Sequence, residues 1–573
     1  MAAVAASRET DVRFGATPWS IVVAAGATTE PRAQSALTEL CRIYWRPIYA
    51  YLRRSGYDTH DAQDLTQSFF QDLLKNETLG RVSRDKGRFR SFLIGALKLC
   101  LADEQAQGAA SDLFRIQSDI AQAIIARLKV LLSPAEKAEI ERIPTADPEA
   151  YNLYLRARAL YYGNEAFVKI GQEDLGKAAT LLESAIARDP RFTQAYCLLG
   201  KVQVGLYVSE YYNKERLPRA RQAIDEALRI SPHSAEAHLA LAIYLYEVRR
   251  DAGAALKELQ IAAPGLPGDT DLYPLRAAIE EQRGEWSRAL EDRKKALEID
   301  PASRYLGDGL VQLNIGLRRY QQAEAVCDRM IASIAGADTS TFWRAKSAIA
   351  VAKGDTKTAM AALDANPYRH TGSMGTAIEV AKLFMIKREY MKAAEILQSL
   401  EEVARQKNML PRRLPDFNNA YWSMLLGHMA RVQGDTARAR SYFESARPGF
   451  EHWLEQNPEE LSPWEVRARV YLAQIDAALG QKEEALRKGR RAAELWPVTR
   501  DATVAPEIAT MLAVAYILAG EHGAALRELE NVVKLPYGPT HGELKLNPIW
   551  DDLRGDLRFD KIIADAAKPI RLD

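Results

Sequence analysis

The motif most suggestive of chemistry in this 573-residue chain is Gly171, four residues, then Gly176 and Lys177. A P-loop has this spacing, because glycine N–H groups cradle the phosphates of a nucleotide and the lysine neutralises them. The next residue of a P-loop is Ser or Thr, whose hydroxyl ligates magnesium, but here it is Ala178. A P-loop also follows a buried strand, whereas the preceding AYNLYLRARALYYG has the pattern of a helix. The sequence therefore argues against nucleotide hydrolysis here.

Other arrangements that could carry catalysis are missing from the sequence. His233 and His238 are five residues apart, which is a poor spacing for two ligands on one helix face. No HExxH, GxSxG or dinucleotide glycine fingerprint occurs. The cysteines are far apart and form no CxxC pair, a pattern of reduced thiols rather than of zinc ligands or disulfides. We therefore predict a protein that is not an enzyme and needs no metal or cofactor. The cysteines are Cys41, Cys100, Cys197 and Cys327.

Composition indicates a protein with a sizeable core and no strong charge bias. Hydrophobic residues make up 47% of the chain and charged residues 27%. The 77 basic and 76 acidic residues give a net charge of +1, which argues against a broad surface for polyanions. The amino terminus lacks the apolar core of a signal peptide, and the run IVVAAGA is too short to span a bilayer. We expect a cytoplasmic protein without a membrane partner.

From about Asp147 onward, helical stretches alternate with Gly and Pro, and small residues recur in a fixed register. The interval from Ala255 to Ala289 is 34 residues, and Ala323 follows after 34 more. A fixed period of this length marks stacked supersecondary units. Small Ala lets two helices cross closely, a large apolar residue fills the next gap, and Pro ends the helix. The register comprises Ala178, Leu182, Ala185 and Pro190; Ala220, Ile224, Ala227 and Pro232; Ala255, Leu259, Ala262 and Pro267; and Ala289, Arg293, Ala296 and Pro301.

These repeats, with turn glycines before the second helices, resemble the tetratricopeptide repeat, a helix–turn–helix unit of 34 residues. The resemblance implies an all-α fold, a solenoid of about nine or ten units over 147–540, whose groove binds a protein or peptide. It makes Ala178 a helix-packing residue and Lys177 a solvated neighbour. The turn glycines are Gly284, Gly354, Gly434, Gly480 and Gly520.

The segments on either side of the array resemble parts of bacterial signalling proteins. Residues 105–146 are similar to the helical linker that follows a TolB-like domain, although the body of that domain is absent. The closing LKLNPIWDDLRGDLRFDKIIAD is similar to the segment that ends such arrays. We expect 541–573 to shield the last apolar face from water, as the ends of solenoids require.

The stretches HDAQDLTQSFFQDLL and GRFRSFLIGALKLCLADE resemble region 2 of bacterial sigma factors of the extracytoplasmic-function class. This similarity covers 17–104 and implies a small helical domain after a disordered tail at 1–16. It implies one helix that docks on core RNA polymerase and another that lies near promoter DNA, where arginine neutralises phosphate and aromatic rings stack on bases. The polymerase contacts would be Asp61, Asp64, Gln67 and Phe70, and the DNA contacts Arg88, Phe89, Arg90 and Phe92.

The sigma-like region departs from its family, which leaves two functions open. Nothing after Glu104 supplies the second helix–turn–helix domain, and the segment QAQGAASD that follows is nearly neutral. DNA binding by this region alone should be weak or absent, since affinity follows the number of phosphates neutralised. The chain is predicted to be a regulatory adaptor whose head contacts RNA polymerase in transcription initiation. The alternative is a pure scaffold for protein–protein interactions with a vestigial sigma-like domain.

Overall fold

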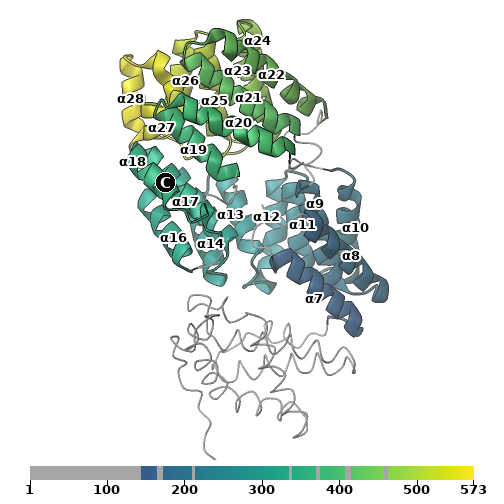
Figure 1. Ribbon diagram of the computed structural model, residues 1–573. Coiled ribbons are helices and arrows are strands. Elements are labelled where there is room, and N and C mark those ends of the chain that lie inside the picture. Colours follow the sequence, from purple (N-terminus) through teal and green to yellow (C-terminus); the bar gives the residue numbers. More distant parts are fainter. Residues whose placement is uncertain are drawn as a thin grey trace, which may run out of the picture. The chain divides into compact units, whose positions relative to one another are not determined.

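The computed structural model describes most of the chain from Pro144 onward (Figure 1). The described residues are 144–163, 172–209, 213–333, 338–368, 374–406, 415–456 and 462–572. The predicted tail 1–16, the sigma-like domain 17–104 and nearly all of the linker 105–146 lie outside these ranges. Their assignments therefore stay predictions.

The chain divides into two compact units, each considered by itself. Of the described residues, the first unit holds 144–163, 177–199 and 226–232, and the second holds 172–176, 200–225 and 233–572. Helices α11 to α28 thus belong wholly to the second unit.

Every regular element in the described ranges is a helix, which confirms the all-α prediction. The earlier helices are α7 (Pro148–Gly163), α8 (Gln172–Arg188), α9 (Thr193–Ser209), α10 (Arg216–Ile230), α11 (Ala235–Glu247), α12 (Ala252–Ala262), η3 (Ala263–Gly265), α13 (Leu272–Arg283), α14 (Trp286–Ile299), α15 (Arg304–Gly316), α16 (Tyr320–Ser333), α17 (Ser340–Lys353) and α18 (Thr356–Asp364). The later ones are α19 (Met374–Ile386), α20 (Tyr390–Gln406), α21 (Pro415–Val432), α22 (Thr436–Gln456), α23 (Pro463–Ala478), α24 (Lys482–Leu495), α25 (Ala505–Leu518), α26 (His522–Val532), α27 (His541–Leu546), η4 (Pro548–Leu553) and α28 (Leu557–Ala566).

Helix α8 removes the P-loop as an interpretation of Gly171–Lys177. Gly176 and Lys177 lie inside this continuous helix, so their backbone N–H groups cannot form a phosphate-binding loop. Ala178 is completely buried and Lys177 is exposed, as the repeat register predicts.

In the second unit the helices form pairs, and the pairs stack in chain order (Figure 1). Each odd-numbered helix from α11 to α25 packs on the even-numbered helix that follows it, and each pair packs on the next. The register alanines Ala255, Ala289 and Ala323 are all completely buried. This part of the chain is an α-solenoid, as the tetratricopeptide resemblance implies.

The turns within pairs use two residue types for one backbone conformation. The predicted turn glycines, Gly284 among them, adopt left-handed φ angles between 76° and 86°. Arg318 and Arg388 adopt φ angles of 55° and 62° at the corresponding place in two other pairs. The residue after each of these three turns donates an N–H to the carbonyl five residues earlier, at 2.8 Å. The left-handed conformation costs a residue with a Cβ atom about 1–2 kcal/mol, so the backbone is strained at the two arginines and relaxed at the glycines.

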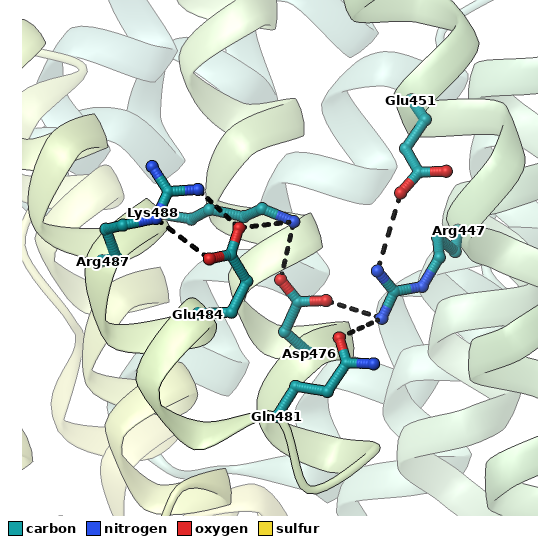
Figure 2. A network of polar contacts seen from close by, with 7 residues as sticks. All are labelled: Arg447, Glu451, Asp476, Gln481, Glu484, Arg487 and Lys488. Atoms are coloured by element: carbon teal, nitrogen blue, oxygen red, sulfur yellow. Dashed lines mark hydrogen bonds and ion pairs between the residues drawn. The ribbon is translucent and has the colours of Figure 1, made fainter.

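A buried carboxylate joins three consecutive helices of the array, α22, α23 and α24 (Figure 2). Asp476 on α23 is completely buried. Its oxygens pair with Arg447 Nη2 on α22 at 2.6 Å and with Lys488 Nζ on α24 at 2.8 Å. Each cation also has a carboxylate nearer the surface, Glu451 for Arg447 and Glu484 for Lys488. The network therefore links three neighbouring helices through one buried carboxylate.

Candidate functional site

Charged and aromatic side chains from five helices gather in the second unit. We call Lys382, Tyr421, Trp464, Arg467, Tyr471, Glu507 and Glu543 the polar cluster. They come from α19, α21, α23, α25 and α27, and the first four of these helices are each the first helix of a pair. The repeat therefore places the residues of α19, α21, α23 and α25 on equivalent faces of successive pairs, and Glu543 comes from outside the repeat.

Ion pairs and ring contacts order the polar cluster. Lys382 Nζ lies 3.1 Å from Glu379 Oε1 on the same helix. Arg467 donates to both oxygens of Glu507, at 3.0 and 2.5 Å, and its guanidinium lies over the Trp464 ring at 5.2 Å. The rings of Tyr421 and Tyr471 have centroids 5.5 Å apart. The cluster thus offers flat aromatic surface beside both signs of charge.

The cluster is accessible and also partly desolvated. Lys382 and Glu507 keep 44% and 43% of their side-chain area exposed, and Trp464 is 45% exposed. Burial raises the pKa of Tyr471 well above its usual value, and burial also raises the pKa of Glu543. The charges of Lys382 and Glu507 act on the pKa of Glu543 in opposite directions. Polar groups in such a place bind a ligand more strongly than polar groups in open water do.

Residues 533–572, which we call the strap, follow the last long helix and return to earlier pairs of the second unit. Trp550 and Phe559 are buried in the core formed with α25 and α26, which covers the last pair. Ile570 and Leu572 pack instead against the core of α14 to α17, and the Ser287 hydroxyl on α14 donates to the Leu572 carbonyl at 3.5 Å. The strap thus does more than the expected shielding of the last face.

The side chain of Arg318, at the turn between α15 and α16, binds backbone carbonyl groups of the strap. Its guanidinium donates to the carbonyls of Val533 at 2.6 Å, Pro539 at 3.1 Å, Lys568 at 3.2 Å and Asp565 at 3.4 Å. Burial lowers the pKa of Arg318, which is the expected effect on a cation that leaves water. The side chain of this one residue thereby contacts both ends of the strap.

Tyr537 of the strap packs on α13 to α15. Its N–H donates to Gly316 O at 3.0 Å, and its hydroxyl donates to Glu281 Oε2 at 3.1 Å. Glu281 is also paired with Arg293 at 2.7 Å, and both of these side chains are about one-tenth exposed. A Cβ at Gly316 would lie 2.7 Å from the tyrosine ring, so only glycine admits the ring there.

Further along the strap, two aspartates and a glycine contact later pairs. Asp551 accepts two bonds from Arg388, at 2.7 and 3.0 Å, and Asp552 accepts one from Arg431 at 2.7 Å. A Cβ at Gly542 would lie 1.7 Å from the carbonyl oxygen of Val351. The strap therefore approaches α17 backbone to backbone.

The predicted site residues lie outside the described ranges, and the described site was not predicted. The eight are Asp61, Asp64, Gln67, Phe70, Arg88, Phe89, Arg90 and Phe92. Two signals in the sequence could have located the strap contacts. Arg318 stands 34 residues after Gly284, and Arg388 stands 34 after Gly354, so each occupies a glycine position of the repeat. Arg293 stands where the other register sets have Leu or Ile.

Glu280 on α13 carries a pH-dependent prediction. It is 6% exposed, and burial, then the nearby Asp292, raises its pKa from 4.5 to about 7, while Arg276 opposes this. Glu285 and Arg288 act on it with opposite signs. The folded state binds the Glu280 proton more tightly than the unfolded state does. Protonation of Glu280 therefore stabilises the folded state fully below pH 4.5, and this stabilisation is lost as pH rises through 7.

We expect Glu280→Gln to remove this dependence. Between pH 5 and pH 8 the free energy of unfolding of the unchanged protein should fall relative to the variant by on the order of 3 kcal/mol. Urea denaturation at several pH values measures the difference. Parallel curves for the two proteins would contradict the assignment.

Within the described part of the chain, no three His, Cys, Asp or Glu side chains are grouped so that they could hold a metal ion. None of the described helices has both the length and the apolar character needed to cross a bilayer.

Comparison with known proteins gives distant likenesses. No family model matches the chain. A curated relative, "Putative adenylate cyclase 3" of Rhizobium meliloti (strain 1021), is 24% identical over 141 residues, which span 24% of this chain and 23% of the relative. The chain thus matches about a quarter of that relative's length.

Solved structures of similar arrangement are also remote. The human IFIT1 dimer with m7Gppp-AAAA is 14% identical, with 91% of this chain and 96% of that chain covered and a TM-score of 0.33. The Cut9–Hcn1 hetero-tetramer of APC/C is 15% identical, with 93% and 98% covered and a TM-score of 0.34. PilF of Pseudomonas aeruginosa is 18% identical, with 48% and 100% covered and a TM-score of 0.27. At these scores the likenesses carry no argument about function.

Proposed function

We propose that the chain is a scaffold for protein–protein interactions that captures a partner's segment on the polar cluster. The observation that carries this proposal is the cluster itself, which combines the exposed Trp464 ring and two half-buried tyrosine rings with paired charges on successive helix pairs. Aromatic and charged side chains together supply contact area and specificity at protein interfaces. Stacked helix pairs present such side chains on a continuous surface, which suits an extended or helical segment.

Contact with RNA polymerase through the sigma-like head is a more specific hypothesis than the scaffold role, and it rests on the sequence resemblance alone. It adds one partner to the scaffold and does not alter the role of the polar cluster. Enzymatic activity is not part of the proposal, since the motifs of the chain supply no catalytic arrangement and the stretch shared with the curated relative covers 23% of that protein.

The test is cross-linked affinity capture with the full-length chain and two matched variants. The first variant combines Lys382→Glu with Trp464→Ala in the cluster. The control combines Lys295→Glu with Met391→Ala on the second helices α14 and α20. Lys295 resembles Lys382, because it is 51% exposed and also pairs with a glutamate three residues away, and Met391 is 67% exposed.

We expect recovery of partner proteins to fall at least tenfold with the cluster variant and to stay unchanged with the control. Equal recovery with both variants would contradict the proposal. Asp61→Lys combined with Asp64→Lys tests the polymerase hypothesis in the same experiment. Core RNA polymerase should be recovered with the unchanged chain and lost with this variant. No recovery with the unchanged chain, or equal recovery with the variant, would contradict the polymerase contact.

A further inference from the structure

We infer that the strap is a conformational device that fixes the curvature of the second unit and thereby sets the geometry of the polar cluster. This inference rests on the proposed function, because it concerns the control of that same cluster. It is carried by three observations: strained arginine turns, contacts of one strap with turns far apart in the chain, and the position of Glu543.

The first observation is that arginine replaces glycine at turns that hold the strap. Arg318 and Arg388 keep left-handed backbone angles that favour glycine, and both guanidinium groups bind strap atoms. Arginine at such a place costs about 1–2 kcal/mol relative to glycine, so another interaction has to offset the strain. The strap contacts supply that interaction.

The second observation is the reach of the strap. In sequence it follows α26, yet it contacts the turn after α15 through Arg318, the turn after α19 through Arg388, and the end of α21 through Arg431. A solenoid otherwise has contacts only between neighbouring pairs, which leaves its curvature free to vary. A segment tied at three separated places restricts that freedom, together with Ala502 before α25, whose N–H donates to Gln282 O on α13 at 2.8 Å.

The third observation connects the strap to the polar cluster. Glu543, the cluster residue of α27, lies four residues beyond Pro539, whose carbonyl Arg318 binds, and next to Gly542, which meets the backbone of α17. Its N–H is capped by the Thr540 hydroxyl at 3.3 Å. The docked strap therefore positions Glu543. Through Asp551 and Asp552 it also binds the turn after α19 and the end of α21, the helices that carry Lys382 and Tyr421.

Hydrogen–deuterium exchange on the full-length chain tests the device without any partner. Arg318→Gly relieves the backbone strain and removes four strap bonds, and we expect the amides of Tyr537–Leu553 to exchange at least tenfold faster. Arg250→Gly is the matched control, because Arg250 has a φ of 53° and pairs with Glu247 of its own turn. Its effect on the strap amides should be less than twofold. Equal rates in the two variants would overturn the inference.

A charge swap provides a second measurement should Arg318→Gly fail to fold. Arg431 and Asp552 are 32% and 42% exposed, so each tolerates a change of charge. Arg431→Asp alone should speed exchange of the strap about threefold, and adding Asp552→Arg should restore the original rate. Exchange that is unchanged in the single variant, or unrestored in the double, would contradict docking through this pair.

The link to the polar cluster is tested by capture. Partners that require the cluster should be recovered at least threefold less with Arg318→Gly and equally with Arg250→Gly. Faster exchange with full recovery would show a strap that does not control the cluster, and would overturn the inference while leaving the scaffold proposal intact. Absence of any cluster-dependent partner would remove the scaffold proposal, and the exchange result would still decide whether the strap fixes the fold.

Discussion

Asp476→Asn should lower the free energy of unfolding of the second unit by about 3 kcal/mol, because it leaves two cations around a buried site without their shared carboxylate. Breaking a buried ion pair costs about 3–5 kcal/mol. The lower end applies here, since Arg447 and Lys488 are 22% and 23% exposed and each keeps a second carboxylate. Urea denaturation followed by circular dichroism measures the loss.

Two controls separate this effect from a general sensitivity of α22 to α24. Glu484→Gln removes a carboxylate that pairs with Lys488 and Arg487 but is 39% exposed, and it should cost less than about 1 kcal/mol. Replacing Arg447, Asp476 and Lys488 together by Met, Leu and Met removes every charge at once and should restore most of the lost stability. Equal losses for Asp476→Asn and Glu484→Gln would show that Asp476 is not a buried partner.

Gly542→Ala should detach the strap from α17 and lower the free energy of unfolding by about 3 kcal/mol, the upper end of the cost of overpacking. The added Cβ would meet the Val351 carbonyl oxygen at 1.7 Å and the Gly354 nitrogen at 2.6 Å. Both are backbone atoms at a helix end, so neither can rotate away as a side chain can. Denaturation gives the stability, and exchange of the strap amides shows where the loss occurs.

The matched control is Gly523→Ala in α26. A Cβ at that glycine would meet only the far end of Arg527, at 3.8 Å, which is an ordinary contact. Alanine favours a helix over glycine by up to about 1 kcal/mol, so the control should be neutral or slightly stabilising. A Gly542→Ala protein as stable as this control would mean that α27 does not lie against α17 in solution.

How far the sequence predicts this protein depends on whether a contact is local or distant. The repeat register located the helix pairs, the buried alanines and the left-handed glycine turns, because these depend on residues within one or two units. The contacts of Arg318 and Tyr537 were not found, since their partners lie 215 and 256 residues away and spacing carries no record of them. The departures were visible as arginines in glycine or leucine positions, but their meaning required the fold.

The contacts of the strap also limit how many hairpins this protein can contain. An ordinary array lengthens or shortens by whole units, because each unit recognises only the one beside it. Here a single stretch near the carboxyl end must meet three arginines whose separation is fixed by the number of helices between them. Inserting or deleting one hairpin between α16 and α21 would put the arginines out of step with the aspartates and carbonyls. The number of units in that interval is therefore set by the contacts between the strap and these three arginines.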